Sequence, residues 1–208
     1  MRRTRVRCRN HGYRVGVPSE QSDEILVALK HGAAALRGAE LDFALGGGLA
    51  AWARGGPPTE HDVDFVIRAC DTEPALAALR KEGMQTESPP EGWLVKAWSD
   101  GVLIDLIFDP LEIEVDDAFF ARCDRMSVAA VGMPVMAIDD VLVGKLLALS
   151  EHNLEFGPPL EWARSLREQI DWSEVGRRTR HSPFARTFFH LLTELDVVPG
   201  CAEQNGIR

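Results

Sequence analysis

Three aspartates on two strand-like segments are the residues of this sequence best suited to chemistry. In "HDVDF", Asp62 and Asp64 are two residues apart, so a strand places both side chains on one face and Val63 and Phe65 on the other. Asp105 lies in the middle of the apolar stretch "VLIDLIF", where an isolated ionised carboxylate is unfavourable unless a partner or a metal compensates its charge. Carboxylate oxygens are the ligands that Mg²⁺ shares with substrate phosphates. The pattern therefore predicts a metal site, for Mg²⁺ or Mn²⁺, built from these three aspartates.

A run of glycines precedes the aspartate pair. Gly46, Gly47 and Gly48 stand between a short apolar run and the helix-like "LAAWAR", where the N–H groups of a strand-to-helix turn form a natural phosphate cradle. The spacing matches neither a P-loop nor a G-x-G-x-x-G motif. Two simpler interpretations are a glycine turn without a ligand and a solvated strand end. The combination of glycines and carboxylates favours a site for a phosphate and its metal.

The pattern "LGGGLAAW…HDVDFVI…VLIDLIF" resembles the DNA polymerase β-type nucleotidyltransferase superfamily, over residues 40 to 110. That superfamily has a glycine pair opening a short helix, an Asp-x-Asp strand and a third aspartate on a later strand. The resemblance implies that Gly47 and Gly48 bind the nucleotide and that Asp62, Asp64 and Asp105 are metal-binding and catalytic. It also implies transfer of an NMP from an NTP to a hydroxyl acceptor, with release of pyrophosphate.

A second resemblance concerns the later helices. The stretches "IDDVLVGKLLALSEH" and "ARSLREQIDW" are similar to the bacterial group that includes the abortive-infection (AbiEii-like) nucleotidyltransferase toxins, with Lys145, Arg167 and Asp171 as the matching residues. In that family an Arg and a Ser or Thr precede the aspartate pair. Here Thr59 is the counterpart of the hydroxyl residue, and Arg54 is displaced. The resemblance implies that Lys145 and Thr59 contact the nucleotide.

Two lysines have alternative interpretations. Lys145 contacts a phosphate, or it lies on an apolar helix and extends its ammonium group to solvent. Lys96, in "GWLVKAW" between Trp93 and Trp98, holds a base or a triphosphate, or it belongs to a strand whose tryptophans serve packing alone. For His61, next to the aspartate pair, a structural role is favoured because a regular strand turns it away from the carboxylates.

The elements that position these residues can be read from periodicity and turn signals. We expect a helix over 19–40, then a strand, the glycine turn, a short helix and the Asp-x-Asp strand, followed by a helix ending at Gly83 and three strands. An acidic linker follows Pro110, with one strand near 127–136 and three helices over 139–153, 159–172 and 183–195. The prediction is an α+β nucleotidyltransferase fold, with a small mixed β-sheet flanked by helices and a helical C-terminal extension.

Charge is unevenly distributed along the 208 residues. Six arginines occur before Glu20, the first acidic residue, while the net charge of the whole chain is -9. Residues 1–18 are therefore expected to form a basic, flexible arm, followed by a nucleotidyltransferase domain over 19–134 and a helical region over 135–208, with the active site in the cleft between them. The net negative charge argues against broad, nonspecific clamping of nucleic acid.

The remaining expectations concern location and partners. The four cysteines are far apart and no stretch is apolar enough to span a membrane, which favours a cytoplasmic protein with reduced thiols and no membrane partner. For the acceptor, an RNA or tRNA 3′ end is favoured, and the toxin-like resemblance implies a cognate antitoxin protein. The alternatives are a small hydroxylated molecule, as in aminoglycoside-modifying relatives, and a catalytically silent module that binds a nucleotide or a partner.

Overall fold

The computed structural model describes residues 20–59, 62–90 and 92–198; the arginine-rich arm and His61 lie outside these ranges. Within these ranges, the fold is built on one mixed seven-stranded sheet of order β3-β4-β5-β2-β1-β7-β6. The strands are β1 (Phe43–Leu45), β2 (Val63–Ile67), β3 (Gln85–Glu87), β4 (Leu94–Ser99), β5 (Val102–Ile107), β6 (Asp124–Val128) and β7 (Val131–Val135). The predicted α+β class is confirmed.

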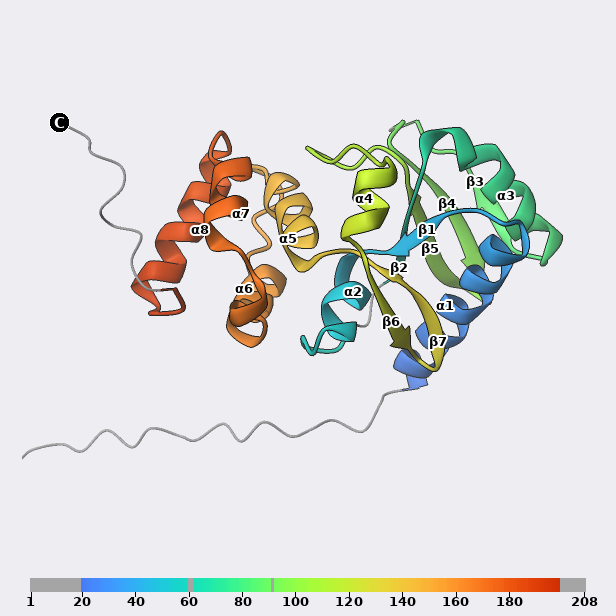
Figure 1. Ribbon diagram of the computed structural model, residues 1–208, viewed down its shortest axis with the longest axis horizontal. Helices are drawn as coiled ribbons and strands as arrows, with labels where there is room; N and C mark the ends of the chain where they lie inside the picture. The colour runs from blue at the N-terminus through green and yellow to red at the C-terminus, as the bar shows by residue number, and fades with distance from the viewer. Residues whose placement is uncertain (1–19, 60–61, 91, 199–208) are drawn as a thin grey trace, which may run out of the picture.

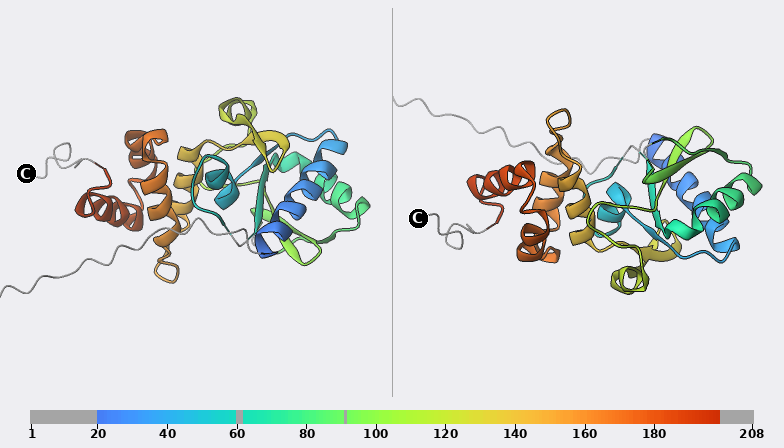
Figure 2. Two further views of the ribbon diagram at one scale, coloured as in Figure 1. Left: turned by 90° about the horizontal axis from the view of Figure 1, so that it is seen from below. Right: turned by 90° about the horizontal axis from the view of Figure 1, so that it is seen from above.

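Helices surround this sheet and continue beyond it. They are α1 (Glu20–Gly38), α2 (Gly47–Ala53), α3 (Thr72–Lys81), α4 (Asp117–Arg122), α5 (Ile138–Leu147), α6 (Gly157–Ser165), α7 (Trp172–Thr179) and α8 (Pro183–Glu194), with 3-10 turns η1 (Ala69–Asp71) and η2 (Arg167–Gln169). Helices α1 and α3 lie at one end of the molecule, and α6, α7 and α8 gather at the other (Figures 1 and 2). Helix α5 connects the two parts, because it packs against α2 as well as against α7 and α8.

One face of the sheet is a closed hydrophobic layer under α1. The side chains of Val63, Phe65 and Ile67 alternate along β2 and are fully buried. The helix approaches the strand closely at Gly32, where an added Cβ would lie 2.9 Å from the Phe65 ring. The alternate residues of β2, which include Asp64, therefore point to the opposite face, away from α1.

The segment between β5 and α5 differs from the expectation. The acidic linker contains the short helix α4. The single strand expected near 127–136 is instead the last residues of β6, a turn and the whole of β7, and β6 and β7 pair antiparallel as a hairpin. The hairpin turns at Ala129 and Ala130, with φ of 49° and 67°. Turns of this kind usually carry Gly or Asn, so two alanines provide no turn signal in the sequence. Helix α4 has six residues, too few for a clear helical periodicity.

The helical region contains more breaks than expected. The helix expected over 139–153 ends at Leu147, and the one expected over 159–172 ends at Ser165. Asp171, which was assigned to the end of that helix, instead caps the start of α7 by accepting a hydrogen bond from the Glu174 N–H. The stretch expected as one helix over 159–172 is therefore most of α6, followed by the 3-10 turn η2 and the first residue of α7.

Two further expectations can be compared with the structure. None of the helices in the described ranges is long and apolar enough to cross a membrane. Cys70 and Cys123 are free thiols, whereas Cys8 and Cys201 lie outside the described ranges.

Candidate active site

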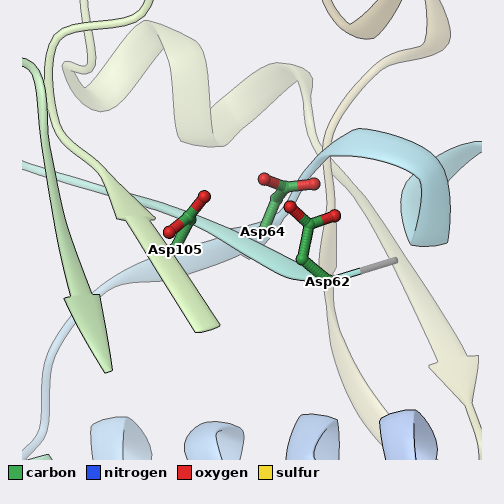
Figure 3. A group of neighbouring side chains, drawn as sticks. All are labelled: Asp62, Asp64 and Asp105. Carbon is green, nitrogen blue, oxygen red and sulfur yellow. The ribbon is translucent and has the colours of Figure 1, made fainter. Parts of the chain in front are cut away.

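The three predicted aspartates converge on the face of the sheet opposite α1. Strands β2 and β5 run parallel, and Asp64 pairs directly with Asp105 in their register. Asp62 lies just before β2, on the same side of the strand as Asp64. One carboxylate oxygen from each aspartate lies within 4.8 Å of the other two, and Figure 3 shows the three groups pointing to the same side of the sheet. The arrangement offers a convergent set of hard oxygen ligands for a divalent cation.

The environment of Asp64 shows how unfavourable three clustered negative charges are. Burial, followed by the charges of Asp62 and Asp105, raises the pKa of Asp64 from 3.8 to about 7. The ammonium groups of Lys145 and Lys96 act in the opposite direction and lower this pKa. A bound cation would relieve the same repulsion, so the donor set and its electrostatics fit a divalent metal.

Lys96 contacts the third carboxylate. It lies opposite Asp105 in the antiparallel β4–β5 pair, and its Nζ is 3.0 Å from Asp105 Oδ1. The sequence contains a signal for this pairing. Asp100 and Gly101 have φ of 50° and 86° and form the two-residue turn of the hairpin, so residues equally distant from the turn face each other. Sequence reasoning considered Lys96 for a base or a triphosphate and did not anticipate its contact with Asp105.

The glycine turn lies against Asp64. The Gly46 N–H donates to the Asp64 carbonyl oxygen at 2.8 Å. Gly47 has φ of 54°, and a Cβ at this residue would lie 1.7 Å from Asp64 Oδ2, a position that no side chain can share with the carboxylate. A Cβ at Gly48 would lie 2.8 Å from Thr59 Oγ1, so the predicted Thr59 contacts the same turn. Glycine is therefore required here for close approach as well as for backbone conformation.

Lys145 lies on α5. It forms an ion pair with Glu155, with Nζ 2.5 Å from Oε2, and its side chain is partly exposed. The positive charge of Lys145 lowers the pKa of Asp64, so the ammonium group is near enough to act on the triad. The phosphate contact of Lys145 stays a prediction.

The other residues of the family resemblance have structural contacts. Arg54 donates to the carbonyl oxygens of Met136 and Val135 at 3.0 and 3.1 Å and pairs with Asp124 at 2.8 Å, which fastens the end of α2 to the β6–β7 hairpin. Arg167 pairs with the adjacent Glu168 at the surface. Asp171 is the N-cap of α7, as described above.

A separate cavity of about 680 Å³ is lined by residues around α4, the start of α5 and α7, and none of the three aspartates lines it. In its wall, Asp140 is 2% exposed and accepts hydrogen bonds from Arg178 at 2.5 Å and from Arg122 at 3.4 Å. The buried carboxylate is thus satisfied by protein groups that join three helices. We assign this cluster a structural role.

Comparison with known proteins identifies the fold. No protein-family profile matches the sequence, and no curated protein matches it either. Among solved structures, the antibiotic-resistance factor ANT(2″)-Ia has a TM-score of 0.50 at 16% identity, covering 82% of this chain and 94% of that one. An antigenic nucleotidyltransferase-like protein from Paracoccidioides brasiliensis has a TM-score of 0.50 at 18% identity, covering 84% and 89%. The chain therefore has the fold of nucleotidyltransferases, as the three-aspartate pattern predicted.

Proposed function

We propose that this protein transfers an NMP from an NTP to a hydroxyl acceptor with release of pyrophosphate, in a reaction that depends on Mg²⁺ or Mn²⁺. The observation that carries this proposal is the convergence of three carboxylate oxygens within 4.8 Å, beside a glycine turn that touches one of them. The nucleotidyltransferase fold agrees with this proposal. The site carries the argument, because one fold can host many functions.

Asp62, Asp64 and Asp105 would hold the metal. A divalent cation bound there supplies positive charge that stabilises the triphosphate and the attacking and leaving oxygens. The protein's own groups supply ligands and alignment. The acceptor oxygen bonds to the α-phosphorus as the bond to pyrophosphate breaks, and the hydroxyl proton passes to the Asp105 carboxylate.

The triphosphate is held on the β1 side of the triad. At Gly47 and Gly48 an added Cβ would collide with Asp64 and Thr59, so glycine keeps the turn close to the triad, and the backbone N–H groups of the turn offer donors to the triphosphate oxygens. Lys145 provides a positive charge within the electrostatic environment of Asp64. These roles follow the family resemblance and the positions of the residues.

An RNA or tRNA 3′ end is the first candidate acceptor. The resemblance of the later helices to the abortive-infection toxins favours it, together with an antitoxin partner and a cytoplasmic location. The arginines of residues 1–18 could engage RNA phosphates.

A small hydroxylated molecule is the second candidate acceptor, and a specific observation favours it. Asp64, Asp105 and Glu87 occupy a row across neighbouring strands, with Lys96 as the single cation among them. This acidic row attracts a cationic molecule and repels a polyanion. ANT(2″)-Ia, which shares the fold, is itself an antibiotic-resistance factor.

Label transfer tests the proposal directly. The protein is offered each α-labelled NTP with Mg²⁺ or Mn²⁺, together with total tRNA or an aminoglycoside panel, and pyrophosphate is measured in parallel. The matched control is Asp62→Asn/Asp64→Asn, which keeps side-chain size. Transfer that disappears in this variant supports the proposal and identifies the acceptor class. Nucleotide binding without pyrophosphate release, in folded protein, supports the silent binding module instead.

A further inference from the structure

The strand order separates two sides of the triad. Within β4-β5-β2-β1, Asp105 lies on β5 and Asp64 on β2, so the glycine turn that follows β1 lies on one side of the carboxylates and β4 on the other. In phosphoryl transfer, the attacking and leaving oxygens lie roughly in line on opposite sides of the phosphorus. If the leaving phosphates lie at the glycine turn, the acceptor hydroxyl therefore reaches Asp105 from the β4 side. The surface of β4 and β5 beside Asp105 is therefore where the acceptor must lie.

That surface carries an apolar pair. Trp98 on β4 pairs directly with Leu103 on β5, and both are two residues from the paired Lys96 and Asp105. Since alternate residues share a face, Trp98 and Leu103 lie on the same side of the sheet as the triad. Both side chains are half-buried, yet within the described ranges neither belongs to the hydrophobic core or packs against it. Core packing does not account for this pair.

We propose that Trp98 and Leu103 form a platform that holds the ring of a small cyclic alcohol, neutral or cationic, with one of its hydroxyls at Asp105. The proposal rests on the proposed function, since it names the acceptor surface of that reaction.

The chemistry around the platform specifies such a ring. The indole face and the leucine methyls bind the apolar C–H face of a ring. On β3, Gln85 pairs with Trp98 and Glu87 with Lys96, and both β3 side chains are exposed. An amide and a carboxylate at the rim accept hydrogen bonds from ring hydroxyl or amino groups. Carboxylates predominate along the adjoining row, which disfavours an RNA end at this surface.

A titration followed through tryptophan signals tests the platform without requiring turnover. The ¹⁵N-labelled protein is titrated with tobramycin as a cationic ring, p-nitrophenyl glucoside as a neutral ring and total tRNA as a polyanion. The Trp98 indole N–H signal is assigned from its loss in Trp98→Phe. We expect tobramycin or the glucoside to move this signal. The signal of Trp93, which lies just before β4 and is 43% exposed, should stay in place.

Variants provide the second measurement. Leu103→Ala and Trp98→Ala should each weaken binding of the small ring about tenfold, Trp98→Phe should largely retain it, and Trp93→Ala should leave it unchanged. In label transfer, the two weakened variants should raise the acceptor KM while the NTP KM stays within about twofold. Trp98→Phe and Leu103→Ala serve as the test if Trp98→Ala does not fold.

Two results would overturn the platform: neither small ring moves the Trp98 signal, or tRNA alone moves it. Failure of the proposed function is distinguishable, because the indole signal would then respond to a small ring while no NTP yields pyrophosphate.

Discussion

Asp64 and Asp105 face each other directly across the adjacent parallel strands β2 and β5, although 40 positions separate them in the sequence. Because paired residues point to the same face, this register brings the two carboxylates together and makes Asp64 the central member of the triad.

Replacing Asp64 with asparagine should abolish nucleotidyl transfer. The amide keeps the size of the side chain but removes the charge that holds a divalent cation, so we expect turnover to fall by at least about a thousandfold. Circular dichroism should remain native, and Mn²⁺ affinity should fall in electron paramagnetic resonance titrations. Asp109→Asn, at an exposed aspartate after β5, is the matched control. Substantial transfer by Asp64→Asn would exclude the proposed role of the triad.

The same variant should be more stable than the wild type above neutral pH. The pKa of Asp64 is about 7 in the fold against an ordinary 3.8, so the native state binds more protons than the unfolded chain between these values. Stability from this group is present at low pH and is lost as pH rises from about 4 to about 7. Without divalent metal, Asp64→Asn should raise the free energy of unfolding at pH 8 by on the order of 1–3 kcal/mol and change it little at pH 4. Urea unfolding at both pH values checks this, and a stabilisation independent of pH would contradict it.

Gly47→Ala should damage the metal site as well as the fold. Its φ of 54° disfavours any side chain, and the new Cβ would lie 1.7 Å from Asp64 Oδ2, so the carboxylate must move. We expect weaker Mn²⁺ binding together with a loss of stability. Gly55→Ala is the control, because that residue has φ of 98° with no atom within 4 Å of the added Cβ. It should lower stability alone, and equal Mn²⁺ affinities in the two variants would refute the close approach.

Lys96→Met should have opposite effects on metal binding and turnover. Removing the ammonium group 3.0 Å from Asp105 removes a charge that repels cations, so Mn²⁺ should bind more tightly. Turnover should nevertheless fall about tenfold or more, because Asp105 loses the partner that fixes its orientation. Lys96→Arg should restore part of the turnover. A uniform loss of affinity and turnover would indicate general disruption of the site instead.

Arg178→Ala should destabilise the helical region strongly. It removes the closer guanidinium partner of Asp140, whose side chain is 3% exposed, and leaves a buried charge poorly compensated. Breaking such a pair costs about 3 kcal/mol or more. Arg177→Ala is the adjacent control, because its pair with Glu174 is exposed and should contribute nothing measurable. Similar melting temperatures for the two variants would show that the buried pair is not needed for stability.

Local patterns were enough to predict much of the fold. The strand around the aspartate pair, the glycine turn and the helices next to them follow from periodicities of two and 3.6 residues and from glycine punctuation, which are properties of short segments. The elements that were missed, α4 and the β6–β7 hairpin, lack those signals. The domain boundary near residue 135 and the nucleotide-binding roles of Lys145 and Thr59 stay predictions.

The sequence by itself determined that Asp62 and Asp64 share a face and that Asp105 stands in an apolar strand, because both facts depend on spacing within one segment. Only the tertiary structure decided that β5 lies beside β2 and that Lys96 reaches Asp105, while Arg54 is committed to the β6–β7 hairpin. It also decided the raised pKa of Asp64. Strand order and burial depend on contacts between segments that are distant in the sequence, and a local pattern carries no information about the energies of those contacts. The candidate residues could therefore be predicted from the sequence, whereas their electrostatic environment could not.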